Sequence, residues 1–310
     1  FLARRLLGAA GTLLGVLVAV FLLVSAAPGD PARLTMIGHG PIGAGSPEAL
    51  AAFRAAHGLD RPLPARLAAW LGSAARLDLG RSFRDGRPVT TRIAETLPAT
   101  FAVNGVAFLL ALLVGLPLGI AAARRPGGTA ARLSAPLLDA LFSLPAFALG
   151  LLLLIVFAVS LRWVPVFAEP TPRGIALPAL TLALVALAPV VRVTQTAVGA
   201  ALAAPATLAA RARGESAVEE TLRALRRSVP AFAGLGASLV PQLVAGSVLV
   251  ERVFGLPGTG QLLADSVFAR DLPTVLGLTL LSGLTVVVAA LASDAASALA
   301  NPRLVEREES

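Results

Sequence analysis

Long stretches without Asp, Glu or Arg recur along this chain, separated by short polar segments. The stretches are Leu6–Gly29, Thr96–Ala123, Ala140–Leu161, Gly174–Val191, Val193–Ala210, Ser228–Val250 and Leu272–Ser293. A helix of about 20 apolar residues crosses a hydrocarbon core of ~30 Å. Only Arg192 separates the two central stretches, which we interpret as one helix over roughly 176–202. The pattern therefore predicts six membrane-spanning helices.

An all-α polytopic fold follows, because backbone amides inside lipid need hydrogen-bond partners within their own segment. A transmembrane β-barrel would show ~10-residue segments of alternating polarity, which the sequence lacks. The composition agrees, since 56% of the residues are hydrophobic and 14% are charged, with a mean hydropathy of +0.81. Soluble domains carry about 25% charged residues, so a soluble protein is excluded. The absence of Cys excludes disulfides, thiolate metal sites and cysteine nucleophiles.

The first apolar stretch has two possible interpretations. Arg4 and Arg5, an apolar run and the small residues Ser25–Ala27 resemble a signal peptide with a cleavage site. The apolar core Leu6–Val24 is longer than the ~7–15 residues of a signal peptide, so we expect an uncleaved span. Because the chain begins at Phe1, we also expect residues to be missing before it.

The distribution of Arg predicts the orientation of the spans. With the N-terminus inside, the cytoplasmic segments carry Arg4, Arg5, Arg124, Arg125, Arg132, Arg211, Arg213, Arg223, Arg226, Arg227, Arg303 and Arg307. The short outer loops carry only Arg162, Arg173, Arg252 and Arg270. Both termini are therefore predicted to be cytoplasmic. Orientation and anionic lipid headgroups account for the net charge of +8, and no basic, aromatic-interleaved cluster indicates nucleic-acid binding.

The predicted domain organisation has four parts. They are a tail with the first span (1–29), an extracytoplasmic helical segment (30–95), a five-helix core (96–303) and a cytoplasmic tail (304–310). In the outer segment, Ser46, Pro47 and Gly58 delimit a helix over Pro47–His57, and a second helix is expected over Pro64–Ala75. We expect this segment to lie against the outer ends of the spans, as a passive plug or as a docking surface.

Soluble-enzyme motifs do not fit this chain. Gly38–Gly43 matches the letters of a dinucleotide-binding loop, but it neither follows a strand nor opens a helix, and it contains Pro41. A nucleotide-binding P-loop requires a Lys, and the chain contains none. His39 and His57 lack nearby ligands, so we predict no metal site, no catalytic residue and no cofactor bound by this chain.

Polar residues within the predicted spans are candidates for a pathway or a structural role, because burying them in lipid is costly. The candidates are Arg192 with Thr194 and Gln195, and also Asn104, Asp139 and Asp294. We interpret Arg192 as a structural ion pair or a snorkelling group, with contact to cargo as the alternative. Asp294 is expected to snorkel or to pair with a basic residue, and Asp139 to be interfacial.

Two loops have compositions suited to movement or docking. The outer loop 251–272 is rich in Gly and Pro, and its Phe254, Leu256, Leu262 and Leu263 are expected to dip into the bilayer as a re-entrant or gating helix. In the inner loop 203–229, Pro205 starts a helix, Gly214 ends it, and a second helix covers Glu219–Arg227. Such a helix–Gly–helix segment is a candidate to dock a soluble partner.

A series of motifs resembles the dipeptide/oligopeptide-type permease family of binding-protein-dependent ABC importers. The matching segments are Pro28–Pro31, Gly58–Leu63, Asp78–Ser82, Leu97–Thr100, Gly115–Gly119, Leu177–Leu180, Glu251–Gly260, Arg270–Pro273 and Asn301–Arg303. The family has a cytoplasmic coupling loop that ends in a glycine, which here resembles Leu208, Ala209, Ala210, Arg211, Ala212, Arg213 and Gly214, with Glu215 following. The outer loop supplies candidate gate or docking residues: Glu251, Phe254, Pro257, Gly258, Gly260, Arg270 and Asp271.

The resemblance implies a type I ABC importer permease in a bacterial inner membrane, which forms the path for peptides or a similar small solute. It implies a second homologous permease, two cytosolic ATP-binding subunits that hold ATP and Mg, and an extracytoplasmic substrate-binding protein. We expect the small residues Ala209, Ala210 and Gly214 to allow close packing into a partner, with Arg211, Arg213 and Glu215 at its rim. The alternatives are an ion-coupled secondary transporter and a membrane enzyme, which would require intramembrane acids or a converging nucleophile.

Overall fold

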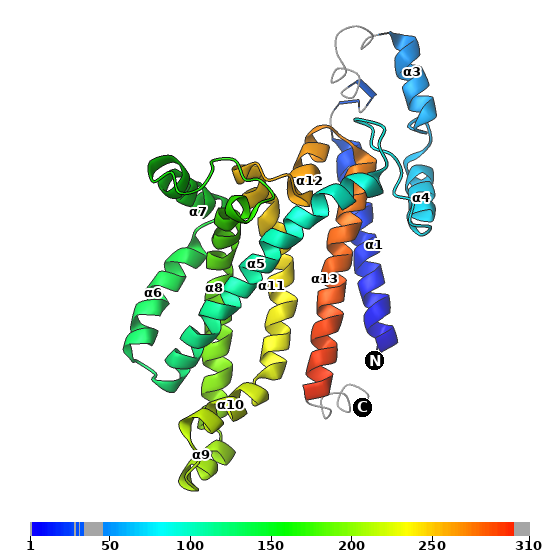
Figure 1. Cartoon of the computed structure of the whole chain (residues 1–310). Coiled ribbons are helices and arrows are strands. Elements are labelled where there is room, and N and C mark those ends of the chain that lie inside the picture. The colour runs from blue at the N-terminus through cyan, green and yellow to red at the C-terminus, as the bar shows by residue number, and fades with distance from the viewer. Residues whose placement is uncertain (1, 28, 31, 34–45, 301–310) are drawn as a thin grey trace. The chain divides into compact units, whose positions relative to one another are not determined.

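The computed structural model describes residues 2–27, 29–30, 32–33 and 46–300, and the regular secondary structure of this part is helical apart from an isolated β-bridge between Arg81 and Pro88 (Figure 1). Its helices are α1 (Leu2–Ala26), α3 (Pro47–Ala56), α4 (Leu63–Ala74), α5 (Val89–Arg124), α6 (Thr129–Ser143), α7 (Ala146–Leu153), the π-helix η1 (Leu154–Ser160), α8 (Pro172–Ala203), α9 (Pro205–Ala212), α10 (Ala217–Arg227), α11 (Val229–Phe254), α12 (Thr259–Phe268) and α13 (Leu272–Ala300). The motif Gly38–Gly43 and His39 lie outside the described residues.

Five helices in the described part are long and apolar enough to cross a membrane. They are Arg5–Ala26 within α1, Val89–Arg124, Pro172–Ala203, Val229–Phe254 and Leu272–Leu299 within α13. A sixth candidate is the pair Ser134–Ser143 and Ala146–Ser160, which is bent by 104°. The prediction of six spans is confirmed when this bent pair counts as one.

The span predicted over Ala140–Leu161 is not one continuous helix, because the chain breaks between α6 and α7. Leu144 at the break has an extended backbone, with φ −83° and ψ 130°. Pro145 forces this conformation, since its ring clashes with a helical residue before it and it has no N–H to donate. A search for charge-free stretches passes over this break, because Pro is uncharged.

The described residues form two compact units. Unit 1 comprises the described parts of Phe1–Arg5, Ala99–Leu256 and Thr285–Ser310, and unit 2 comprises those of Leu6–Pro98 and Pro257–Leu284. In unit 1, α8 packs against α6, α7, α10 and α11, and Figure 1 shows α8 and α11 running alongside each other. The core of unit 1 includes Val103 and Ala107 of α5, Leu182 and Val190 of α8, and Leu239 of α11. As the sequence predicts, Arg192 lies within one continuous helix.

Two glycines bring α5 against α8 within unit 1. A Cβ at Gly115 would lie 2.6 Å from Val190 Cγ1, and one at Gly119 would lie 2.5 Å from Thr194 Cβ and 2.8 Å from the carbonyl oxygen of Val191. Real Cβ atoms do not approach so closely, so these positions admit only Gly at this helix spacing. The Gly115–Gly119 motif of the sequence therefore fixes how closely the two spans pack.

In unit 2, the segment between the first two spans packs against the ends of α1 and α13. The prediction of two short helices is confirmed, since α3 has Ser46 as its N-cap and Gly58, with φ +62°, follows its C-cap. The apolar residues of this segment pack against Leu17 and Phe21 of α1 and against Leu272 and Leu276 of α13. The residues that the segment contributes are Phe53, Leu59, Leu67, Trp70, Leu71 and Phe83. The segment therefore shares a core with the two spans.

Candidate functional site

The helices α9 and α10 of unit 1 form an elbow around Gly214, which we call the α9–α10 elbow (residues 205–227). Pro205 starts α9, Gly214 adopts a left-handed backbone with φ +89°, and Ser216 caps α10. Ser216 and Glu219 form a capping box: Ser216 N and Oγ donate to Glu219 Oε2 at 2.9 and 2.7 Å, and Glu219 N donates to Ser216 Oγ at 3.3 Å. The Ser216 hydroxyl hydrogen bond lowers the pKa of Glu219, because it stabilises the carboxylate.

Glu220 holds the elbow together from inside. Its side chain is only 6% exposed and accepts a hydrogen bond from Arg211 Nε at 2.9 Å, within an ion pair that joins α9 to α10. Arg124 at the end of α5 lies 3.8 Å from Glu220 and donates to the carbonyl oxygen of Ala217 at 2.6 Å. Arg227 NH1 also donates to Thr207 Oγ1 at 3.1 Å. These contacts fix α9 and α10 to each other and to α5, so the elbow can move as one body.

The surface of the elbow is apolar and basic. Leu208 and Leu222 are each 50% exposed and Val218 is 78% exposed. Large exposed apolar side chains on otherwise polar helices are typical of an interaction surface. Arg213 is exposed and forms no ion pair with any residue that the structure describes.

The coupling residues predicted from the sequence divide into exposed and internal groups. Leu208, Ala209, Arg213 and Gly214 are exposed, whereas Ala210 is 2% exposed and faces the elbow's own interior. Neighbours in this chain cover Ala210, and its packing into a partner stays a prediction. Arg211 pairs with Glu220 and Glu215 pairs with Arg223, so these charges stabilise the elbow itself. Docking by the exposed residues stays a prediction.

The polar residues of the spans are mostly paired within the chain. Arg192 forms an ion pair with Asp139 and its guanidinium lies 5.7 Å from the ring centre of Phe142. Asp294 lies 3.2 Å from Arg5. These pairs correspond to the structural interpretation of Arg192 and to the expected partner of Asp294.

Asn104 and Gln195 differ from these pairs. Asn104 Nδ2 donates to the carbonyl oxygen of Thr100 at 2.9 Å, but its Oδ1 is buried and has no partner among the described residues. Gln195 is half-buried and forms no hydrogen bond within the described part of the chain. Contact of either residue with cargo stays a prediction.

The candidate gate residues of unit 1 are buried at the end of α11. Glu251 is fully buried and accepts a hydrogen bond from Thr100 Oγ1 at 2.8 Å. Phe254 is 1% exposed, and its carbonyl oxygen accepts a hydrogen bond from Ala168 N at 2.7 Å. Gly255 ends α11 in a left-handed conformation with φ +65°. Neither side chain is exposed in this structure, so direct docking by them requires rearrangement.

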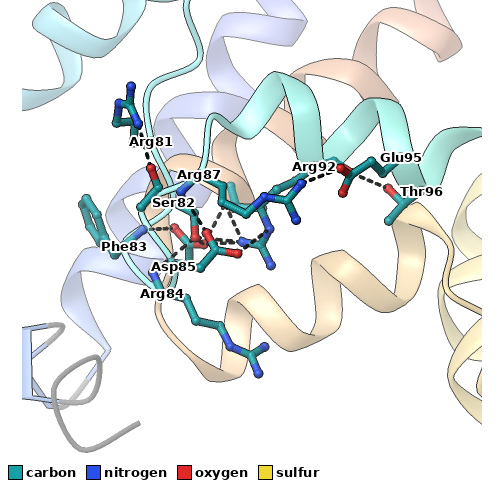
Figure 2. Close-up of polar contacts among 12 residues, drawn as sticks. Arg81, Ser82, Phe83, Arg84, Asp85, Arg87, Arg92, Glu95 and Thr96 are labelled. Carbon is teal, nitrogen blue, oxygen red and sulfur yellow. Dashed lines mark hydrogen bonds and ion pairs between the residues drawn. The ribbon is translucent and has the colours of Figure 1, made fainter. Parts of the chain in front are cut away.

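In unit 2, Asp271 is the centre of a buried hydrogen-bond network. Its Oδ2 accepts hydrogen bonds from Ser82 Oγ at 2.5 Å, Thr274 Oγ1 at 2.7 Å and Arg92 NH1 at 2.9 Å, and its Oδ1 accepts one from Phe83 N at 2.9 Å. Figure 2 shows Arg92 reaching from α5 toward Ser82 and Asp85, and Arg92 Nε lies 3.5 Å from Asp85. A carboxylate with four donors is a strong positioning element, since each charge-assisted bond is worth about twice a neutral one.

The other candidate gate residues are parts of turns in unit 2. Gly258 is the N-cap of α12, Gly260 is buried in its first turn, and Pro257 precedes them. Arg270 has a positive φ of +55° and donates hydrogen bonds to the carbonyl oxygens of Ala27 and Gly29. The expected helix in loop 251–272 exists as α12, and its function as a gate stays a prediction.

Sequence reasoning missed the residues that hold these candidates in place. Ser82 and Thr100 lie within recognised motifs, but their acidic partners are 189 and 151 residues away and no local pattern indicates them. The Ser216–Glu219 capping signature marks the start of α10, but it does not indicate that Glu220 faces inward. Within the described residues, no three His, Cys, Asp or Glu are grouped to hold a metal ion.

Comparison with known proteins decides the class of this molecule. The family described as "Binding-protein-dependent transport system inner membrane component" matches residues 115–306, and the N-terminal part of the same kind of membrane component matches residues 1–104. The chain belongs to this family. It is thus a multi-pass inner-membrane permease of a binding-protein-dependent ABC transport system, and it is a non-catalytic subunit. Such a system includes an ATPase, which uses ATP, and a binding protein as partners.

Relatives of this permease match over nearly its whole length. It is 36% identical over 318 residues to the glutathione transport system permease protein GsiC of Pectobacterium atrosepticum, with 98% of each chain covered. It is 35% identical over 306 residues to GsiC of Salmonella typhimurium, again with 98% of each covered. A permease protein of Brucella abortus, whose name assigns it provisionally to peptide transport, is 34% identical over 312 residues, with 97% of each covered.

Proposed function

We propose that this permease, paired with a second homologous permease, forms the path by which a small peptide of the size class of glutathione enters the cell. An external binding protein delivers the peptide, and two cytosolic ATPases hold ATP and Mg. The similarity to glutathione and peptide permeases supports this cargo. Both termini lie in the cytoplasm, as the distribution of arginines predicts.

The α9–α10 elbow carries the proposal, because it is an internally locked body with an exposed apolar and basic surface. Glu220 binds α9 to α10, while Leu208, Val218 and Leu222 remain exposed. A rigid elbow transmits force, and an exposed apolar surface supplies the area that a partner buries. ATP-driven closure of the ATPases pushes this elbow and rocks the spans between outward-open and inward-open states.

Reconstitution tests the energy source and the cargo. Proteoliposomes that contain both permeases, the ATPases and the binding protein are expected to accumulate labelled glutathione only when the ATPases have ATP. The permease alone should accumulate nothing, with or without a proton or sodium gradient. Uptake driven by a gradient without ATP would instead assign the chain to the ion-coupled transporters. ATP-driven uptake of nickel but not of peptides would overturn the cargo alone.

Single cysteines test the orientation, because the natural chain contains none. Arg213→Cys, in the exposed tip of the elbow, is expected to react with a membrane-impermeant maleimide only after the cells are broken open. Arg76→Cys, exposed after α4 in the segment 46–95, should react in cells whose outer membrane alone is permeable. The reverse labelling pattern would invert the proposed topology and remove the elbow from the cytosolic ATPases.

A further inference from the structure

Unit 2 contains a cavity of ≈ 220 Å³. Phe21 of α1 and Leu272 and Leu276 of α13 supply apolar lining, and Trp70 and Phe83 contribute aromatic rings. Arg61 and Arg66 also line this cavity. We call it the α4 pocket, since α4 carries Arg66 and Trp70.

The two arginines of the α4 pocket have no counter-ion in the part of the chain that the structure describes. Neither Arg61 nor Arg66 has a carboxylate within 4.0 Å among the described residues, whereas Arg54 of α3 pairs with Asp30 and Arg92 pairs with Asp271. Arg66 instead lies 5.8 Å from the ring centre of Phe21. Burial lowers the pKa of Arg66, because desolvation disfavours its charged form. A partly desolvated cation without a partner is stabilised by an anion.

The wall of the α4 pocket contains a buried hydrogen-bond donor that is not used within the described part of the chain. The indole Nε1 of Trp70 is buried and has no partner among the described residues. With two guanidinium groups and no carboxylate in the lining, the wall is complementary to negative charge.

The pocket lies at the ends of two membrane spans. Phe21 is one to two turns from the end of α1 at Ala26, about 8 Å along the helix axis, and Leu272–Leu276 form the first turn of α13. The polar headgroup layer is about 5–8 Å thick on each side of the hydrocarbon core. Arg66, 5.8 Å from the ring centre of Phe21, therefore lies within about two helical turns of the end of the first span.

We propose that the α4 pocket binds the phosphate of an anionic phospholipid, with Arg61 and Arg66 facing the headgroup and Phe21, Leu272 and Leu276 facing the glycerol and upper acyl chain. The apolar lining favours a lipid over free phosphate, which would leave that surface wet. The bound lipid would fasten the segment 46–95 to the first and last spans.

Quenching of Trp70 fluorescence tests this proposal. The chain has two Trp residues, so Trp163→Phe leaves Trp70 as the only one, within the full permease in nanodiscs. Phosphatidylglycerol that carries a quencher near its headgroup is expected to quench Trp70 at lower membrane fractions than the same quencher on phosphatidylcholine. Arg61→Gln and Arg66→Gln should each reduce this preference about fivefold, since a cation at an anionic surface contributes about 1 kcal/mol.

Matched variants separate a lipid site from general basicity. Arg76→Gln removes an exposed arginine outside the pocket and should leave the preference unchanged, whereas Arg66→Lys, which retains the charge, should keep most of it. Equal effects of the three Gln variants, or equal quenching by both lipids, would overturn the proposal. Displacement of the lipid by inorganic phosphate at equal concentration would show a free-anion site. Protection of Trp70 only on addition of the binding protein would assign the pocket to a protein contact and also overturn it.

Discussion

A Gly214→Glu permease is expected to insert and fold normally but to lose the substrate-stimulated ATP hydrolysis of its partner ATPases. Gly214 has a φ of +89°, where an L-residue is strained by about 1–2 kcal/mol, yet a Cβ at this position would meet nothing within 4 Å. The strain and the new negative charge therefore act on the tip of the α9–α10 elbow rather than on the core. The measurement is ATPase activity of the purified complex with and without loaded binding protein.

Two further variants distinguish the elbow from a general effect. Gly86→Glu adds the same charge at another left-handed glycine, with φ +68° and open space around its Cβ, but it lies in unit 2. This variant should retain substrate-stimulated hydrolysis. Gly214→Ala introduces the backbone strain without the negative charge. An intermediate ATPase activity in this variant would show that strain and charge each contribute to the loss of activity in Gly214→Glu. Full stimulation in the Gly214→Glu complex would show that the docking surface lies elsewhere.

The spans were predictable because lipid imposes one simple rule on the sequence. Charge-free stretches mark hydrocarbon depth, and this rule located α1, α5, α8, α11 and α13. It failed at Leu144–Pro145, where backbone geometry rather than polarity breaks the helix. It also placed the start of α5 at Thr96 instead of Val89, because Arg92 and Glu95 are charged but still helical.

The candidate sites were predictable only as far as local patterns extend. The limits of α9 could be predicted from Pro205 and Gly214, because the start and the end of a helix depend on neighbouring residues. Asp271 was recognised within a motif, but its ion-pair partner Arg92 is 179 residues away. Such a pairing depends on tertiary packing, which periodicity and capping signals do not encode. The structure therefore supplies what the sequence left open, namely which charges are used internally and which remain for partners.

Asp271→Asn is expected to destabilise unit 2 by about 3–5 kcal/mol, because it leaves the buried guanidinium of Arg92 without its main counter-charge. The Asp271 and Arg92 side chains are only 1% and 11% exposed. An Asn amide cannot satisfy the site in either orientation. In one orientation the NH₂ group of Asn would take the Oδ2 position and face Arg92. In the other it would take the Oδ1 position and face the backbone N–H of Phe83. Arg92 and the Phe83 N–H are both hydrogen-bond donors, so neither can bond to an NH₂ group.

The measurement is thermal unfolding of the purified permease, followed by the fluorescence of Trp70 with Trp163→Phe as the background. Asp85→Asn is the matched control, since Asp85 also lies 3.5 Å from Arg92 but its side chain is 35% exposed. An exposed pair contributes under about 1 kcal/mol, so this variant should unfold close to the parent temperature. An equal loss in both variants would mean that the general charge around Arg92, and not the buried network, stabilises unit 2.

A double variant separates a lost ion pair from lost packing. Asp271→Asn combined with Arg92→Gln removes both charges, so no uncompensated ion remains buried. If the charge pair dominates, the double variant should be more stable than Asp271→Asn alone, and the coupling energy should be large. If the hydrogen bonds from Ser82 and Thr274 dominate instead, the loss of stability caused by Arg92→Gln should add to the loss of stability caused by Asp271→Asn. Recovery in the double variant would establish that Arg92 needs Asp271 mainly as a counter-ion, which explains why an acidic residue immediately precedes α13.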